Sequence, residues 1–313
     1  MYDERTETIC ARICLLSAAE KMLGDPPALS RPAVHALYRH GALNGLVLRQ
    51  CAGVDEKVMD QARVLLTRAS SVYEHLNQCI ERGYQAMLPQ DSQWPQALFA
   101  LKNTMPLYLF AKGNLSLLSG RKMAVAGSRA ITAQTHMTVR RIGEALARAG
   151  VTIVTGGAAG VDQTAVCAVL ENGGNAVIVP AITDVQLLGD PMISAALEQG
   201  RLLLLCETLP DEPFSPAKAL TRNHTIYALG DAALVLASRA GKGGSWSGAR
   251  ACIRGQWSLL YALDERGPDY EGNVKLLNQG ARPMKCSDHG LMLGEDTIEE
   301  FYLQAPGIQT SLF

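Results

Sequence analysis

Short, wholly apolar segments alternate with longer amphipathic ones from residue 122 onward, and this rhythm constrains the fold more than any other feature of the sequence. The apolar segments predict strands and the segments between them predict helices. The predicted strands are 122–126, 151–155, 175–179, 202–206 and 232–236, and the predicted helices are 134–149, 161–172 and 191–199. Apolar strands joined through helices are typical of a mostly parallel sheet that helices cover on both faces. We therefore expect an α/β fold, completed by a strand near 257–262 and a helix over 272–279.

The first 85 residues have a helical pattern instead. The predicted helices are about 9–22, 32–41 and 55–82. Prolines then interrupt short apolar pieces as far as residue 120, which excludes a long helix there, and 107–110 predicts a strand. We expect a small helical domain over 1–85 and the α/β domain over 86–313.

The charge of the chain is balanced, with a formal net charge of −1. A protein that coats nucleic acid without specificity is usually strongly basic, so an anionic ligand must meet a local basic patch here. One candidate patch lies within 121–148 and contains Arg121, Lys122, Arg129, Arg140, Arg141 and Arg148. The last three are better explained as the solvated face of a helix, whereas Arg129 lies in a turn.

The cysteines and the apolar runs indicate a compartment. No two of the eight cysteines form a C-x-x-C pair, which disfavours a zinc ribbon or a thioredoxin-type site. Scattered thiols suit the reducing cytosol. The N-terminus lacks the apolar stretch of a signal peptide, and no apolar run approaches the roughly 20 residues that cross a bilayer. We expect a cytoplasmic protein with no metal site and no membrane partner.

A glycine-serine-arginine turn, Gly127-Ser128-Arg129, directly follows the first strand of the α/β domain. Parallel sheets bind ligands at the carboxyl ends of their strands. Glycine lets the backbone approach an anion closely, serine offers a hydroxyl, and arginine can hold a phosphate with two hydrogen bonds. A plain turn with a surface arginine explains these residues equally well.

A glycine-rich segment with Gly156, Gly157 and Gly160 follows the second strand and precedes a helix. Backbone N–H groups at such a position can form an anion nest. We expect Asp162 to be structural, because a carboxylate in the first turn complements the helix dipole. The spacing departs from G-x-G-x-x-G, which disfavours a dinucleotide site, and no G-x-x-x-x-G-K-[ST] sequence is present to suggest a P-loop.

Two further clusters complete the candidate site. Arg222-Asn223 follows a long stretch over 208–220 that we expect to be irregular because prolines interrupt it, and a loop of that length beside a sheet is usually functional. Arginine can grip a phosphate and asparagine can bond a base edge, although the pair could instead cap the helix that follows. Gly244 and Ser245 follow the fifth strand and open another helix, where serine could cap the helix or contact phosphate. We expect the adjacent Trp246 to face the core.

No catalytic constellation accompanies these clusters. The six histidines are isolated from partners in the sequence, and no serine sits in a G-x-S-x-G elbow. No cofactor motif is present either. The pattern therefore favours a protein that binds phosphates, in nucleic acid, over an enzyme.

Taken together, the clusters resemble the DprA/Smf family of DNA-processing proteins over about residues 88–285. Single pieces are weak, but seven of them occur in the family's order. They are D-x-x-W-P-x-x-L at 91–98, P-L-Y at 106–108 with G-N at 113–114, G-S-R at 127–129, T-G-G-A-A-G-V-D at 155–162, Glu207 with Arg222-Asn223, Gly244-Ser245, and G-N-x-x-L-L-x-x-G-A at 272–281.

The resemblance implies a Rossmann-like domain that binds single-stranded DNA in a basic pocket. It also implies a homodimer that loads a RecA-type recombinase onto that DNA, as in natural transformation. The N-terminal helices would correspond to the family's small SAM-like or helix-hairpin-helix-like domain. Arg129 and Arg222 would hold phosphates, Ser128 and Asn223 would add hydrogen bonds, and the glycines would supply backbone N–H groups.

Several positions depart from the family pattern. Ala159 stands where the family often has arginine, and His224 replaces the second arginine of R-N-R-I. Each phosphate contact contributes to affinity and to its dependence on salt. We therefore predict weaker DNA binding than in a typical member, or an altered ligand.

Two other functions fit the same residues. One is a sensor or hydrolase of a small nucleotide, related to the LOG phosphoribohydrolases, although their P-G-G-x-G-T-x-x-E signature is absent. The other is a diverged scaffold that has kept the fold and lost DNA binding.

Overall fold

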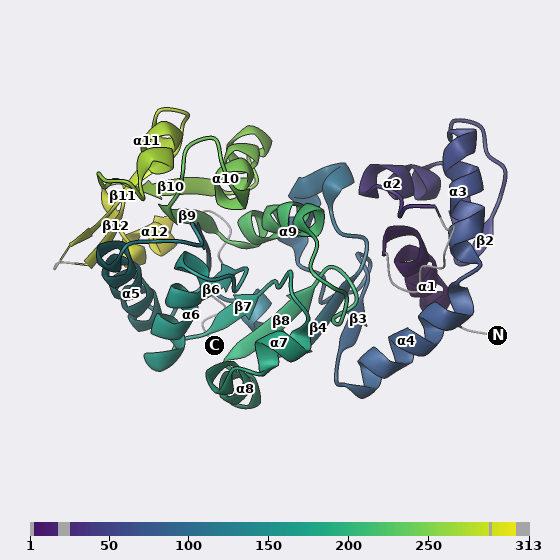
Figure 1. The fold of residues 1–313 in the computed structure, drawn as a ribbon, viewed down its shortest axis with the longest axis horizontal. Helices are drawn as coiled ribbons and strands as arrows, with labels where there is room; N and C mark the ends of the chain where they lie inside the picture. Colours follow the sequence, from purple (N-terminus) through teal and green to yellow (C-terminus); the bar gives the residue numbers. More distant parts are fainter. Residues whose placement is uncertain (1–2, 18–25, 288–289, 305–313) are drawn as a thin grey trace.

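A single mixed sheet of 11 strands organises the described residues of the chain. The computed structural model describes residues 3–17, 26–287 and 290–304 (Figure 1). Seven neighbouring strands run parallel, in the order β11-β10-β9-β5-β6-β7-β8. They are β5 (Lys122–Gly127), β6 (Thr152–Thr155), β7 (Ala176–Ile178), β8 (Leu202–Cys206), β9 (Ala232–Ala237), β10 (Leu259–Leu263) and β11 (Arg282–Ser287). The expected mostly parallel α/β fold is confirmed.

Antiparallel strands extend the sheet at both edges. They are β4 (Leu109–Gly113) and β3 (Gln85–Met87) beside β8, and β12 (Gly290–Leu293) and β13 (Asp296–Thr297) beside β11. The sequence did not predict β3 or the strands after residue 281. β3 and β13 are only three and two residues long, and three of the six residues of β11 are polar.

The order of the strands reverses at β5. From β5 the chain adds β6, β7 and β8 on one side, and then crosses to place β9 on the other side, with Met123 paired to Ala232. Crevices that bind ligands in doubly wound sheets lie at such a reversal, outside the carboxyl ends of the strands. Gly127 at the end of β5 and Ser238 just after β9 therefore mark the expected position of a site.

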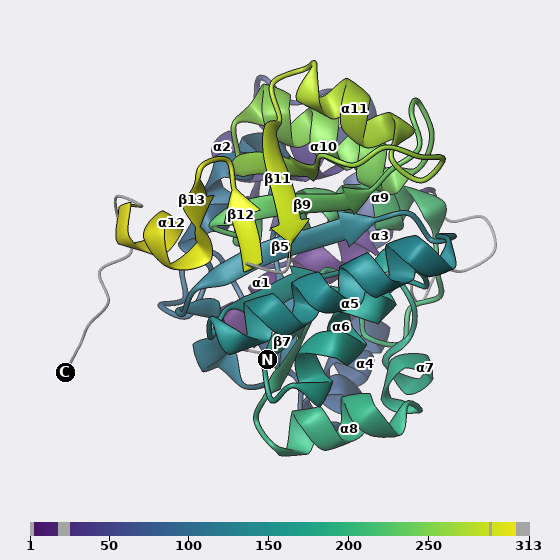
Figure 2. The same ribbon diagram turned by 90° about the vertical axis from the view of Figure 1, so that its left-hand side faces the viewer.

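Helices cover both faces of the parallel strands (Figure 2). One face packs against α5 (Ala133–Arg148), α6 (Val161–Glu171), α7 (Asp184–Leu188), α8 (Pro191–Glu198) and α12 (Ile298–Gln304). The other packs against α9 (Pro216–Leu229), α10 (Gly244–Gly255), α11 (Glu271–Leu277) and the 3-10 helix η1 (Gln96–Thr104). Along β5, Met123 and Val125 enter the first core layer and Ala124 and Ala126 enter the second. This alternation explains why the strand is apolar throughout.

The N-terminal helices pack against the β3–β4 edge of the sheet (Figure 1). They are α1 (Glu4–Leu16), α2 (Arg31–Arg39), α3 (Glu56–Leu66) and α4 (Ala69–Glu81), with a small hairpin of β1 (Leu43–Asn44) and β2 (Val47–Leu48) after α2. Ile9 and Ile13 of α1 share one core cluster with Tyr108 and Phe110 beside and within β4. The predicted boundary between residues 85 and 86 stays a prediction.

The prediction of one helix over 55–82 is wrong. Two helices, α3 and α4, take its place, and a turn that contains Arg68 joins them. Arg68 is 3% exposed, and its side chain donates hydrogen bonds to the carbonyl oxygens of Leu65 and Cys14. Satisfying a buried guanidinium in this way favours a turn over a continuous helix. The predicted first helix ends at Leu16, and residues 18–22 of it lie outside the described residues.

Helix α9 begins earlier than the sequence suggested. The stretch 208–220 was expected to be irregular because of its prolines, but Pro216 is the first residue of α9. Proline is favoured at this position, since its missing N–H would have no partner within the helix anyway. Arg222 and Asn223 therefore lie inside the helix and do not cap it. No described helix has the length and apolar character that a membrane span requires.

Candidate functional site

A cavity of about 830 Å³ opens at the point where the strand order reverses. Its walls are the turns after β5 and β9 and the first halves of α9 and α10. We call it the main cavity. Seven of the ten predicted site residues line it: Gly127, Ser128, Arg129, Arg222, Asn223, Gly244 and Ser245.

Arg222 forms the buried floor of the main cavity. It is 5% exposed, and no described residue accepts a hydrogen bond from its Nε or Nη1. Burial lowers the pKa of Arg222, which the negative charges of Asp162 and Glu207 oppose. A buried cation without hydrogen-bond partners is costly, and an anion bound against it would remove that cost.

Gly156 makes room for this guanidinium. A Cβ atom at position 156 would overlap Nη1 of Arg222. Gly156 therefore supports the floor of the main cavity from behind and does not line it.

A carboxylate of the chain itself lies beside the glycine-rich segment at the start of α6. The buried Asp162 carboxylate lies close to the backbone of Gly156 and Ala158 and to the charge of Arg222. Burial raises the pKa of Asp162 to about 6, although the charge of Arg222 and the nearby backbone N–H groups oppose the rise. This placement agrees with the structural role expected for Asp162.

Gly157 and Gly160 also lie outside the lining of the main cavity. Gly160 has a φ of 84°, and a Cβ there would overlap the carbonyl oxygen of Ser128. The next N–H, that of Val161, donates to the same oxygen at 3.1 Å. Gly160 thus lets the Gly-Ser-Arg turn pack directly on α6.

Two further hydrogen bonds fix the Gly-Ser-Arg turn. Ser128 donates its N–H to the carbonyl of Ala237 at 2.9 Å, and the Ser245 hydroxyl donates to the carbonyl of Gly127 at 2.6 Å. Ser245 therefore joins α10 to the turn, while Asn223 packs against Gly244, where an added Cβ would lie 2.6 Å from its Nδ2. Trp246 is 7% exposed and belongs to the core, as expected.

Three exposed cations surround the main cavity above Arg222. They are Arg129, Arg239 and Lys242. The guanidinium carbon of Arg129 lies 5.7 Å from the ring centroid of Phe214, another exposed residue of the lining. Among the lining residues, Asp162 is the one carboxylate. The local charge of the main cavity is therefore positive in a chain whose net charge is −1.

Arg239 and Lys242 were missed by the sequence analysis, although they follow a predicted strand just as Arg129 does. The basic patch expected over 121–148 does not form one site, because only Arg129 of its six residues lines the main cavity. Two of the others form ion pairs elsewhere. Nζ of Lys122 lies 3.8 Å from Oδ1 of Asp231, and Nη2 of Arg140 lies 2.5 Å from Oε2 of Glu171.

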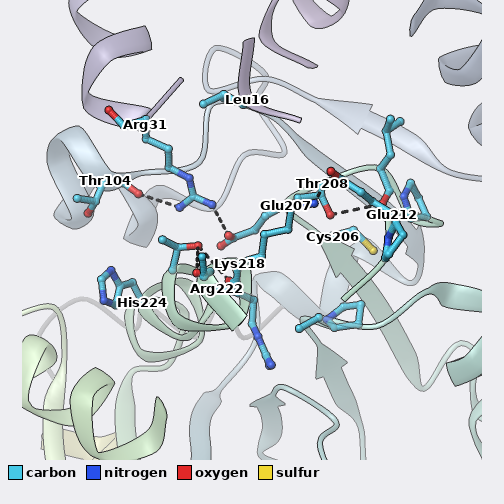
Figure 3. Close-up of a pocket in the computed structure, with 18 of the residues that line it drawn as sticks. Leu16, Arg31, Thr104, Cys206, Glu207, Thr208, Glu212, Lys218, Arg222 and His224 are labelled. Carbon is cyan, nitrogen blue, oxygen red and sulfur yellow. Dashed lines mark hydrogen bonds and ion pairs between the residues drawn. The ribbon is translucent and has the colours of Figure 1, made fainter. Parts of the chain in front are cut away.

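A second, smaller cavity of about 310 Å³ lies between the N-terminal helices and the end of β8 (Figure 3). Arg31 of α2 pairs there with Glu207 and donates to the carbonyl of Thr104 at 2.9 Å. Glu207, which matches the acidic residue of the family's E…R-N block, thus joins the helical part of the chain to the sheet. Arg222 lines both cavities.

The fold and the main cavity together define a Rossmann-like α/β protein with a basic cavity at its switch point. Comparison with known families identifies it further. The model of the DNA recombination-mediator protein A family matches residues 85–293, and the chain belongs to this family.

Individual relatives agree with this assignment. The chain is 26% identical to the DNA processing protein DprA of Bacillus subtilis over 222 residues, which cover 70% of this chain and 72% of that protein. It is 30% identical to the protein Smf of Borreliella burgdorferi over 185 residues, 58% of this chain and 57% of that one.

Solved structures of relatives have the same fold. The X-ray structure of DprA from Streptococcus pneumoniae matches 97% of this chain and 99% of its own with a TM-score of 0.70, at 20% identity. DNA processing protein A from Helicobacter pylori matches 64% of this chain and 90% of its own with a TM-score of 0.54, at 27% identity. The Helicobacter structure is described for its mode of binding single-stranded DNA.

Proposed function

We propose that this chain is a DNA-processing protein that binds single-stranded DNA in the main cavity. The observation that carries the proposal is Arg222, a buried guanidinium without hydrogen-bond partners among the described residues, beneath three exposed cations. Membership of the family and the single-stranded DNA bound by the Helicobacter relative support it.

The depth of Arg222 favours a single strand over a duplex. A phosphate must enter the main cavity to reach a guanidinium that is 5% exposed. A flexible single strand can bend one phosphate inward, whereas the two strands of a stiff duplex hold their phosphates on a wide cylinder. In this arrangement Arg129, Arg239 and Lys242 follow the backbone on either side of the buried phosphate. Ser128 and Asn223 offer hydrogen bonds at the wall.

The finer biological role is carried over from the family. In our proposal the protein acts as a homodimer and delivers the coated strand to a RecA-type recombinase, as in natural transformation. Neither step requires catalysis by this chain. The cytoplasm is the proposed location, and the eight free thiols suit a reducing compartment.

A small nucleotide is the competing ligand. The volume of the main cavity, about 830 Å³, lies within the range that holds drug-sized molecules. Bound mononucleotide would place its phosphate against the same Arg222, so the two ligands must be separated by experiment.

Competition in a fluorescence-anisotropy titration separates them. Labelled oligo-dT is titrated with protein, and unlabelled oligo-dT, duplex DNA and mononucleotides are added as competitors. We expect unlabelled oligo-dT to displace the label far more effectively than duplex of equal length, and mononucleotides to leave it bound. Displacement by mononucleotide at comparable concentration would replace our proposal with the nucleotide-binding function.

A further inference from the structure

Three side chains of metal-binding types meet where α4 approaches the loop between β8 and α9. His75 and Cys79 belong to α4, and Asp211 belongs to the loop. One imidazole nitrogen, the thiol sulfur and one carboxylate oxygen all lie within 4.8 Å of one another. None of the three lines the main cavity or the smaller cavity beside Glu207.

The local structure explains how these side chains meet. Residues four apart on a helix lie on the same face, so α4 presents His75 and Cys79 together. Asp211 arrives only through the tertiary fold, which is why the sequence analysis expected no metal site. Nε2 of His75 lies 2.8 Å from each carboxylate oxygen of Asp211.

Cys79 is the buried member of the cluster. It is 0% exposed, and within the described part of the chain its thiol has no hydrogen-bond partner. A thiol that points at an imidazole and a carboxylate without bonding either is placed as a metal ligand would be.

The donor set selects the kind of cation. Zn²⁺ takes imidazole nitrogen, thiolate sulfur and carboxylate oxygen at about 2.0–2.3 Å, which sets tetrahedral ligand atoms about 3.5 Å apart. Small side-chain rotations would bring the three atoms from within 4.8 Å to that separation. Mg²⁺ and Ca²⁺ prefer oxygen ligands alone and do not suit this set.

The surroundings of the cluster carry negative charge. Arg82 pairs with both Asp184 and Asp211, so two carboxylates face one guanidinium. A divalent cation would neutralise the remaining charge together with the thiolate that its binding creates.

We propose that His75, Cys79 and Asp211 form a zinc site that fastens α4 to the loop before α9, with a water molecule as fourth ligand. Zinc binds Nε2 of His75, whose neutral imidazole then carries its proton on Nδ1, and the thiol proton of Cys79 passes to solvent. The second oxygen of Asp211 keeps its 3.1 Å hydrogen bond from Arg82, which orients the carboxylate. The loop held in this way leads directly into the helix that carries Arg222.

Metal content and cobalt spectra test the site. The full chain is stripped with a chelator, loaded with Zn²⁺, dialysed and analysed for metal. We expect one zinc per chain in the wild type and less than a tenth of that in Cys79→Ala, His75→Gln and Asp211→Asn. Loading with Co²⁺ should give a near-ultraviolet thiolate charge-transfer band that Cys79→Ala abolishes.

Cys14→Ala is the matched control, because Cys14 is equally buried and belongs to the same core cluster as Cys79. It should bind zinc like the wild type. Circular dichroism checks each variant, and if Cys79→Ala fails to fold, the two partly exposed positions His75 and Asp211 decide. Wild-type protein that holds well under one zinc after dialysis, or variants that bind as Cys14→Ala does, would overturn the proposal.

Discussion

The buried charges of Arg222 and Asp162 lie close enough to shift each other's pKa. Gly156 leaves space for the guanidinium, and the carboxylate of Asp162 lies near it. Of the glycines that the sequence analysis assigned to phosphate, Gly156, Gly157 and Gly160 lie outside the lining of the main cavity, whereas Gly127 and Gly244 belong to it. In our proposal, the side chains of Arg222 and the exposed cations contact the phosphates.

Gly156→Ala tests this supporting role. The added methyl overlaps Nη1 of Arg222 and must displace the guanidinium from the floor of the main cavity. Because a hydrogen bond to a charged group contributes about 1.5–3 kcal/mol, we expect affinity for oligo-dT to fall about tenfold to a hundredfold. Gly120→Ala is the control, since a Cβ there meets nothing within 4 Å. Equal affinities for the two variants would contradict the role given to Gly156.

Asp162 should make stability depend on pH. Its pKa is about 6 in the folded protein, above the ordinary value of 3.8, so between these values the folded state binds more protons than the unfolded state. Stability from this group is therefore greatest at low pH and is lost as pH rises through about 6. The change amounts to about 3 kcal/mol at 1.36 kcal/mol per pKa unit.

Urea unfolding of the wild type and Asp162→Asn at several pH values isolates this contribution. The asparagine variant does not titrate, so its stability relative to the wild type should increase as the pH rises from 4 to 7. A difference that stays constant over this range would show that the carboxyl group titrates normally.

Among the elements, the strands of the parallel sheet could be predicted from the sequence, whereas the start of α9 and the surroundings of the start of α6 could not. The strands were predictable because their residues are apolar on both faces, which is the pattern of a covered parallel sheet. Pro216 was taken as a helix breaker, although proline also starts helices. The burial of the Asp162 carboxylate beside the glycine-rich segment depends on side-chain geometry that a motif does not contain.

The contact between α2 and the end of β8 should contribute strongly to stability. Arg31 pairs with Glu207, whose side chain is 5% exposed, and removal of the arginine leaves that carboxylate buried without its cation. We expect Arg31→Ala to lower the free energy of unfolding by about 3 kcal/mol, as measured in urea. Arg39→Ala, which loses an exposed hydrogen bond to Asn103, should lower it by less than about 1 kcal/mol. Equal effects of the two substitutions would exclude an anchoring role for Glu207.

At the scale of the whole molecule, the chain concentrates cations in one cavity and pairs many of them elsewhere. The order of motifs along the sequence was sufficient to identify the family, because it does not depend on the position of any one side chain. The composition of the site was predicted less well. Arg239 and Lys242 join Arg129 only because β5 and β9 are neighbours in the sheet, and strand order is not visible in a list of strands.

Salt dependence should report how many of these cations hold phosphates. For single strands the slope of log affinity against log salt is about −0.7 per neutralised phosphate, so up to four contacts predict a slope no steeper than about −3. Arg239→Ala and Lys242→Ala should each reduce its magnitude by about 0.7. Arg140→Ala removes a cation paired to Glu171 outside the main cavity, and its slope should match the wild type. Variants of the main cavity that keep the full slope would exclude Arg239 and Lys242 from the interface.

The position of a bound strand tests the central claim most directly. In a crystal structure of the full chain with a short oligo-dT, we predict one phosphate inside the main cavity, within hydrogen-bond distance of the Arg222 guanidinium. Its neighbouring phosphates should lie beside Arg129 and Lys242. A strand bound elsewhere on the protein, with Arg222 still without a hydrogen-bond partner, would contradict the account.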